Sequence, residues 1–170
     1  SPTCIEENTM NNPKQLKARF PYQFAGKNIG LSISRGWFLL FEKLCEDIDH
    51  LLGDDKHDFH WTQLKEKFGA ARFYFALDGK SEMFIDFISP HGVKTVRPTT
   101  AKHETEANLR QQIQALINKA TSSTNRLCIV CGEPGAVDQF ENYLLVLCKR
   151  HADLRRVDQL PPAWFEEDEQ

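Results

Sequence analysis

The chain lacks a long apolar run: it contains no stretch of about 18 apolar residues, the length that a membrane-spanning helix requires. It also shows no apolar leader of the kind that is cleaved on export. Cysteine is sparse, with 5 in 170 residues, far below the density of disulfide-stapled secreted domains. We therefore expect a cytoplasmic protein in a reducing compartment, without a membrane partner.

Recognisable catalytic motifs are absent as well. The sequence has no glycine-rich phosphate loop, no nucleophile elbow and no zincin motif. An excess of positive charge is also missing, because the net charge is −3 and the pI is near 6.1, whereas nucleic-acid-binding domains are usually basic. These absences favour a protein that is not an enzyme, and they make nucleic acid an alternative partner rather than the first expectation.

Four residues near the C-terminus nevertheless have the types and the spacing of metal ligands. Cys128 and Cys131 form a CxxC pair, and Cys148 and His151 form a CxxH pair further on. Two such pairs suit tetrahedral zinc, because each short pair holds the ion from one turn while the residues between them form a hairpin. Since protein side chains then fill all four positions, no metal-bound water is left to be activated. We predict one structural Zn²⁺ ion.

The segments around the two pairs predict the order of elements in a zinc module. The glycines of Gly132–Gly135 permit a tight turn, a zinc knuckle, in which backbone amides point at sulfur. Tyr143–Leu147 is typical of a strand, and His151–Arg156 is typical of the start of a helix. Knuckle, hairpin and helix follow one another in treble-clef zinc folds. We expect a treble-clef or ribbon-like zinc module over residues 126–160.

A nuclease is the enzymatic alternative for such a module. Treble-clef folds of the HNH nuclease type use a catalytic histidine on the hairpin beside the metal, but the segment from Asp138 to Leu147 contains no histidine. That absence weighs against hydrolysis of nucleic acid. Asp138, Glu141 and His151 keep a zinc-associated, nuclease-like enzyme as a third hypothesis.

The middle of the chain, residues 20–125, predicts an α+β core. From Gly36 to Gly53 and again from Glu104 to Ser122, apolar residues recur every three or four positions, which is typical of amphipathic helices. Between these helices, four segments combine strand-forming residues with glycine turns. The expected strands are 57–68, 71–77, 83–88 and 93–96. We expect an antiparallel β-meander packed against two helices.

Both ends of the chain are expected to lie outside that core. Residues 1–19 are polar and show no periodicity, which is typical of a disordered tail. Residues 161–170 predict an acidic C-terminal tail in which Trp164 and Phe165 can dock while the run Glu166–Glu169 stays solvated.

Three features of the sequence together resemble a known group of proteins. They are Trp37 with Leu44-Cys45, the string Gln63–Tyr74, and the pairs Cys128-x2-Cys131-Gly and Leu147-Cys148-x2-His151. In this order they resemble small uncharacterised bacterial proteins, often carried by phages and plasmids, with a KEKFG-x-x-RFY hairpin before a C-terminal CxxC...CxxH module. The likeness covers about Gly36–Ala152 and implies no particular activity. The expected hairpin over 83–96 is an insertion relative to that pattern.

The first expected helix carries an acidic face opposite its apolar stripe. The carboxylates of this face are Glu42, Glu46, Asp47 and Asp49. Such a face would steer a basic partner and repel phosphate. Together with the missing catalytic motifs, it predicts a non-catalytic binding protein that acts on a basic protein partner, as an antagonist or immunity-type inhibitor of a mobile element would. The simpler interpretation is a solvated helix face.

Basic residues provide the alternative, a nucleic-acid-binding module. These residues are Lys65, Lys67 and Arg72 on the expected hairpin, and Lys149, Arg150, Arg155 and Arg156 around the expected C-terminal helix. They could contact phosphate, although alternating charge beside a turn is also typical of a wet sheet face. A contiguous basic surface would favour nucleic acid, and an acidic surface would favour a protein partner.

Three further groups have simpler structural interpretations. The histidines His50, His57 and His60 lie among aspartates but follow no ligand template, which favours a solvated helix end. Cys45 could act as a nucleophile, yet its place on an apolar stripe favours a core residue. Aromatic residues of the expected strands could stack on bases, but the core also requires them. These aromatic residues are Trp61, Phe73 and Phe75.

Overall fold

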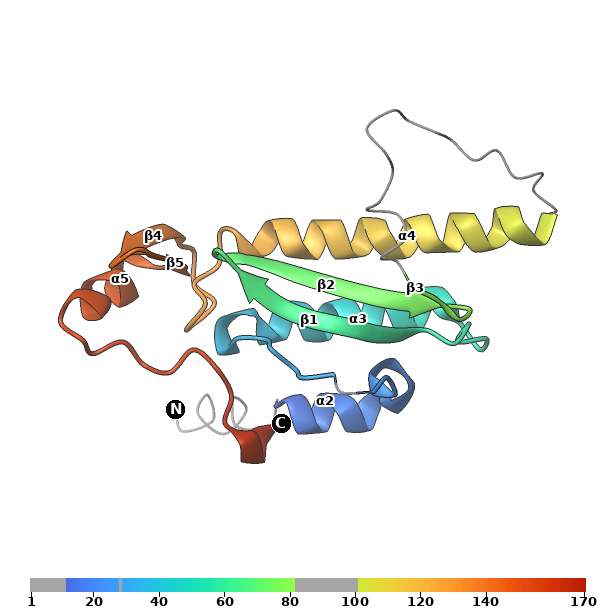
Figure 1. Ribbon diagram of the computed structural model, residues 1–170, viewed down its shortest axis with the longest axis horizontal. Coiled ribbons are helices and arrows are strands. Elements are labelled where there is room, and N and C mark those ends of the chain that lie inside the picture. Colours follow the sequence, from blue (N-terminus) through green and yellow to red (C-terminus); the bar gives the residue numbers. More distant parts are fainter. Residues whose placement is uncertain (1–11, 28, 82–100) are drawn as a thin grey trace, which may run out of the picture.

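The computed structural model describes residues 12–27, 29–81 and 101–170. This part of the chain is a mixed α/β fold with four α-helices and two small antiparallel sheets (Figure 1). None of these helices is both long and apolar enough to cross a membrane. In chain order, the elements are α2 (Pro13–Arg19), η2 (Pro21–Phe24), η3 (Arg35–Trp37), α3 (Phe38–Leu52), β1 (His60–Lys67), β2 (Ala70–Leu77), β3 (Lys80–Ser81), α4 (Ala101–Thr124), β4 (Ala136–Phe140), β5 (Tyr143–Leu147), α5 (Lys149–Arg156) and η5 (Glu167–Glu169).

Helix α3 supplies the central apolar stripe of the core. Phe41, Cys45 and Ile48 are each 0% exposed, and their spacing places them on one face of the helix. The expected helix is confirmed, with Arg35–Trp37 as a 3-10 turn before it. It ends at Gly53, whose φ of +69° suits glycine.

Strands β1 and β2 form an antiparallel hairpin whose inner face packs against α3. The ring of Phe41 lies 5.3 Å from that of Trp61 and 5.2 Å from that of Phe73. Along β2, Phe73 is buried, Arg72 is exposed and Tyr74 is half-buried, as strand alternation predicts. The aromatic residues of the hairpin that were expected in the core are therefore buried there.

The second long helix, α4, and a third strand, β3, complete the main α/β core. Helix α4 runs beside β2 and packs on α3 (Figure 1), with Ile113 and Ile117 at most 2% exposed. It spans Ala101–Thr124 and is longer at both ends than predicted. A third strand, β3, is only two residues long and pairs with the end of β2. The strands predicted at 83–88 and 93–96 lie outside the described residues.

The N-terminal segment is folded where it is described, so the disordered tail predicted for residues 1–19 is wrong in its second half. Asn12 and Gln15 exchange side-chain and backbone hydrogen bonds in a capping box that begins α2. Leu16, 1% exposed, anchors this helix in the core. One apolar anchor in a seven-residue helix produces no periodicity, which is why the pattern did not reveal it. Residues 1–11 lie outside the described residues.

The C-terminal module shares one core with the rest of the protein. Ile129 and Val146, each 0% exposed, belong to the same buried cluster as Trp37. The Gly36 amide donates a hydrogen bond of 2.9 Å to the Ile129 carbonyl oxygen, and Trp37 Nε1 donates one of 2.9 Å to the Leu127 carbonyl oxygen. The segment predicted as a zinc module is therefore joined to η3, just before α3, by one backbone hydrogen bond and one hydrogen bond from a side chain.

The last residues of the chain fold back onto the start of α3. The ring of Phe165 lies 5.3 Å from that of Phe38, so the predicted docking of Phe165 is confirmed. Arg35 stacks over Phe165 at 4.7 Å and pairs with Glu169 at 3.0 Å. The prediction that the run Glu166–Glu169 stays solvated is wrong at Glu169, because the Arg35 guanidinium forms an ion pair with its carboxylate.

Candidate metal centre and basic hairpin

Four side chains from two parts of the C-terminal segment meet in one cluster. Cys128, Cys131, Cys148 and His151 each place one ligand atom within 4.8 Å of the others. The sulfurs of Cys131 and Cys148 are 3.8 Å apart, and His151 Nδ1 lies 3.5 Å from the Cys128 sulfur and 3.2 Å from that of Cys148. Around a tetrahedral zinc ion, bonds of about 2.3 Å to sulfur and about 2.0 Å to nitrogen separate ligand atoms by about 3.8 Å (S···S) and about 3.5 Å (S···N). The predicted ligands thus form a Cys₃His group that could hold a metal ion.

Local backbone structure delivers each ligand to this cluster. Cys128–Gly132 forms a tight turn in which the Gly132 amide donates to the Cys128 carbonyl oxygen at 2.8 Å, and Gly132 has a φ of +78°. Strand β5 ends at Leu147, so that Cys148 follows as the N-cap of α5. His151 lies on the buried side of the first turn of that helix, 6% exposed. The predicted order of a tight turn, a hairpin and a helix is confirmed.

The surroundings adjust the protonation of these ligands. Burial raises the pKa of the Cys128 thiol, but hydrogen bonds from backbone amides, the largest from Cys148, outweigh burial and lower this pKa below its usual value. Burial raises the pKa of Cys131 to about 11. Burial lowers the pKa of His151, and the charge of Arg150 lowers it further. A thiolate at Cys128 and a neutral imidazole at His151 are the forms that bind metal.

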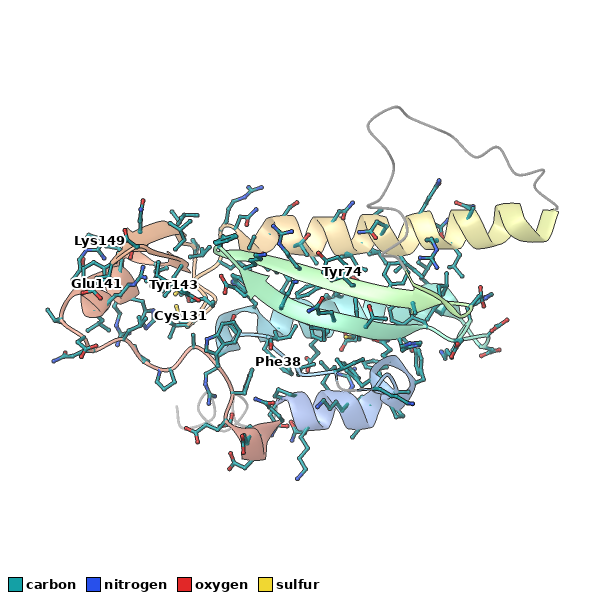
Figure 2. The ribbon with its side chains drawn as sticks, in the orientation of Figure 1. Phe38, Tyr74, Cys131, Glu141, Tyr143 and Lys149 are labelled. Carbon is teal, nitrogen blue, oxygen red and sulfur yellow. The ribbon has the colours of Figure 1, made fainter. Side chains whose placement is uncertain are left out.

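The acidic residues of the nuclease-like hypothesis do not join this cluster. Asp138 lies 2.9 Å from Arg155 and 2.9 Å from Arg156, and hydrogen bonding chiefly from Arg156 lowers the pKa of its carboxyl group. Glu141 is exposed in the β4–β5 turn, and Figure 2 shows it at the same end of the molecule as Cys131. Within the described residues, the Cys₃His group alone assembles as a metal site. A carboxylate held by two guanidinium groups is a poor general base.

The predicted cations around α5 divide into structural and exposed residues. Arg155 also donates to the carbonyl oxygens of Phe140 and Tyr143, at 3.2 and 2.8 Å, and thereby ties α5 to the hairpin of β4 and β5. Lys149 pairs with Asp153 at 3.0 Å, with both side chains largely in solvent. Arg150 is exposed, and no described carboxylate pairs with it. Lys149 and Arg150 are thus the cations of this helix that are most exposed to a partner.

All four carboxylates of the predicted partner-binding face are engaged within the protein. The ion pairs are Arg19 with Glu46 at 2.8 Å and with Glu42 at 3.7 Å, Lys43 with Asp47, and Lys56 with Asp49 at 2.9 Å. Asp49 also accepts a hydrogen bond from the Tyr22 hydroxyl. Helix α2, which the sequence did not predict, supplies Arg19. The acidic face is therefore largely neutralised by neighbouring cations.

The predicted basic residues of β1 and β2 show the opposite arrangement. Lys65 and Arg72 lie directly opposite each other in the strand register, on the outer face where Figure 2 labels Tyr74. No described carboxylate pairs with Lys65, Lys67 or Arg72. Lys65 Nζ lies 5.8 Å from the ring centre of Tyr74, and Lys67 Nζ lies 5.4 Å from that of Phe68. We call these five residues the hairpin surface.

The tip of this hairpin rests against the C-terminal module. A Cβ added to Gly69 would lie 3.8 Å from Val146 Cγ2 and 3.9 Å from the Leu144 carbonyl oxygen, both of β5. Phe68, beside it, is 72% exposed. The strand that supports the tip leads directly into Cys148 and α5. The metal centre and the hairpin surface are thereby linked through β5.

The remaining predicted groups take their simpler interpretations. His57 lies 3.7 Å from Asp55 and 3.6 Å from Asp78, but no metal-binding group forms with His50 or His60 among the described residues. Cys45 is 0% exposed, and burial raises the pKa of its thiol well above the usual range. A buried, protonated thiol is a core residue rather than a nucleophile.

Sequence reasoning missed two residues that organise the structure. Gly36 packs against the metal-binding turn, and its place beside Trp37 gave no signal of that contact. Gln23 is 0% exposed; its side chain donates to the Cys45 carbonyl oxygen at 3.0 Å and accepts from Trp61 Nε1 at 3.2 Å. A single glutamine within an apolar stretch was the one available hint of this buried contact.

Comparisons of the chain with protein-family models, with curated proteins and with solved structures each gave no significant match.

Proposed function

We propose that this protein is a non-catalytic nucleic-acid-binding protein whose hairpin surface contacts phosphate. The Cys₃His group binds one structural zinc ion, and the knuckle, the β4–β5 hairpin and α5 form a treble-clef-like module around it. This module supports the tip of the β1–β2 hairpin through β5. The role of the metal is to hold the hairpin surface in place.

The donor set supports zinc as the metal. Three thiolates and one imidazole at tetrahedral distances suit Zn²⁺ better than Mg²⁺ or Ca²⁺, which prefer oxygen ligands. Because four protein ligands complete the coordination, the ion has no open position for a substrate or an activated water. A stabilising role for the metal follows from that closed site.

The observation that best supports a binding function is the position of Lys65 directly across from Arg72 on the neighbouring strand. Two cations face each other across neighbouring strands, an arrangement that is unfavourable for folding. No described carboxylate relieves it, although in the same fold each carboxylate of the predicted acidic face lies in an ion pair, with Arg19 shared by Glu42 and Glu46. An anionic partner would relieve this repulsion. Phosphate is the anion that a row of Lys and Arg side chains most commonly binds in nucleic acids.

The geometry of the strand suits a polyanion rather than a single anion. Lys65 and Lys67 lie on the same face of β1, about 7 Å apart at the usual rise per residue, and Arg72 lies beside Lys65 on β2. Contacts of this kind bind phosphates without reading the base sequence. We therefore expect binding that depends strongly on salt and weakly on sequence.

Neutral substitutions test this proposal. Zinc-loaded protein is titrated against a labelled single-stranded oligonucleotide by fluorescence anisotropy at several salt concentrations. Each lost phosphate contact should reduce the slope of log K against log salt by about 0.7. We expect this reduction for Lys65→Gln, Lys67→Gln and Arg72→Gln. Lys14 is an exposed residue of α2. Lys14→Gln is therefore the matched control and should leave the slope unchanged.

The proposal fails if the zinc-loaded wild-type protein shows no salt-dependent binding to the oligonucleotide. The sequence-based hypothesis of a basic protein partner, with its role as a mobile-element antagonist, stays a prediction that the same assay tests with polylysine as the probe. Glu46→Lys is an unsuitable variant for the polylysine assay, because it breaks the ion pair with Arg19. The double variant Arg19→Glu, Glu46→Arg exchanges the two charges and keeps an ion pair between these positions. Polylysine binding without oligonucleotide binding would favour that hypothesis.

A further inference from the structure

We infer that the hairpin surface selects single-stranded over duplex nucleic acid by stacking a base on the ring of Phe68. This inference rests on the function proposed above. It identifies the class of nucleic acid, and it assigns to Phe68 a role that neither the fold nor the turn requires.

Phe68 occupies a position that is unfavourable for its side chain in two ways. It is the first residue of a two-residue turn in which Phe68 and Gly69 have φ values of +55° and +80°. Such turns favour Asn-Gly or Gly-Gly, because a side chain in the left-handed region is strained. The ring is also 72% exposed, so it adds little to the core. A strained, exposed phenylalanine at a loop tip is the kind of outlier that indicates function.

The neighbours of this ring fit a single strand. Lys67 lies over the Phe68 ring, and Lys65 lies over the ring of Tyr74 further along the face. Each ring is thus accompanied by a cation that can contact a phosphate while a base stacks on the ring. Base faces are accessible in single strands, whereas in a duplex they are covered by the stacked neighbours. An aromatic ring at the tip therefore favours single strands.

A duplex is the main competing occupant, because a two-stranded ribbon can enter the major groove. In that case the cations of the hairpin surface would still contact phosphate, but the exposed ring would have no base face to cover. The contribution of the ring therefore distinguishes the two occupants. An acidic polypeptide is a third occupant, and it would be held by the cations alone.

Three substitutions at one position separate the ring from the turn. Phe68→Asn removes the ring and suits a positive φ, so we expect a higher melting temperature together with weaker binding to single strands. Phe68→Leu keeps an apolar side chain without a ring and should weaken the same binding. Phe68→Tyr keeps the ring and should retain it. Loss of one stacked base should weaken affinity roughly 5- to 150-fold.

The experiment compares a labelled single-stranded oligonucleotide, its annealed duplex and polyglutamate, each titrated with zinc-loaded protein. We expect the tightest binding to the single strand, with loss on Phe68→Asn and Phe68→Leu for that probe alone. Equal or tighter binding to the duplex, unaffected by Phe68, would overturn the inference while leaving the proposed function standing. Polyglutamate binding as tight as oligonucleotide binding would overturn both the inference and the proposed function. A protein that binds neither the single strand nor the duplex would also overturn both.

Discussion

Gly36 packs directly against the turn Cys128–Gly132, which carries two members of the Cys₃His group. A Cβ at this position would lie 1.9 Å from the Cys128 carbonyl oxygen and 2.7 Å from the Gly132 amide nitrogen. Both neighbours are backbone atoms of the turn that carries Cys128 and Cys131, so neither can move without shifting a member of the Cys₃His group. Glycine is required here by close packing rather than by its conformation.

Gly36→Ala should therefore destabilise the protein strongly. Because the added methyl group overlaps fixed backbone, we expect a loss of at least about 3 kcal/mol in the free energy of unfolding, at the upper end of overpacking effects. Urea unfolding of zinc-loaded protein measures it. Gly30→Ala is the matched control, since a Cβ there meets nothing within 4 Å. Similar stability of both variants would contradict the close packing at Gly36.

The carboxyl group of Asp49 should contribute part of the pH dependence of the free energy of unfolding. Hydrogen bonds, the largest from the Tyr22 hydroxyl and another from Lys56, lower the pKa of its carboxyl group. Since the folded-state pKa lies below the unfolded value, the stabilisation is fully present above the unfolded pKa of about 4 and is lost as the pH falls through the folded pKa. Acid should also release the metal, because its ligands must be deprotonated.

Asp49→Asn separates these two effects of acid. The difference in unfolding free energy between wild type and Asp49→Asn should be constant near neutral pH and should shrink below about pH 4. Urea unfolding across that range, with zinc content measured in parallel, checks it. A difference that persists undiminished at the lowest pH would show that the Asp49 charge does not contribute to stability.

At the scale of elements, charged faces with similar sequence patterns have different environments. The acidic face of α3 meets Arg19 of α2 and Lys56 of the following loop, whereas the outer face of β1 and β2 meets no described carboxylate. The periodicity of a helix or a strand determines which residues face outward. It does not determine which other element packs beside them and pairs with their charges. Because the acidic face is paired and the hairpin surface is not, nucleic acid replaces a basic protein as the favoured partner.

The metal-binding element should support the whole domain and not only its own segment. Structural zinc contributes about 10–16 kcal/mol of apparent binding free energy in small zinc modules, which is comparable with the roughly 5–15 kcal/mol stability of a domain. Because Ile129 and Val146 lie in the common core, loss of the metal should destabilise α3 and the hairpin as well. We therefore expect Cys131→Ser to lose zinc and to unfold cooperatively at a lower temperature.

Elemental analysis and thermal unfolding by circular dichroism test this prediction together. The wild-type protein, purified without chelator, should hold one zinc ion per chain. Cys45→Ala removes a buried thiol outside the metal cluster and should keep the zinc, which makes it the control. Full zinc content in Cys131→Ser would contradict the role of Cys131 as a ligand, and an unfolding transition confined to the C-terminal segment would contradict the shared core.

At the scale of the whole molecule, both ends of the described chain contribute to the fold. Helix α2 brings Leu16 and Arg19 to the core and to α3, and the C-terminal segment brings Phe165 and Glu169 to Phe38 and Arg35. Figure 1 shows α2 and the final turn close together beneath the sheet. Lys17 of α2 donates to the Gln170 carbonyl oxygen at 3.1 Å. Short polar segments with one or two apolar anchors form these contacts.

The sequence by itself determined the members of the Cys₃His group, the helix α3 and the alternating faces of β2, because each depends on local spacing. A CxxC pair, a helical stripe and a strand alternation are set by the geometry of a few consecutive residues. Tertiary structure alone decided that Arg19 pairs with Glu46, that Gly36 packs against the Cys128–Gly132 turn, and that no carboxylate in the described part of the chain pairs with Lys65 or Arg72. The first two contacts join segments that are distant in the chain, and the third depends on which segments pack beside the hairpin, so no local period records them.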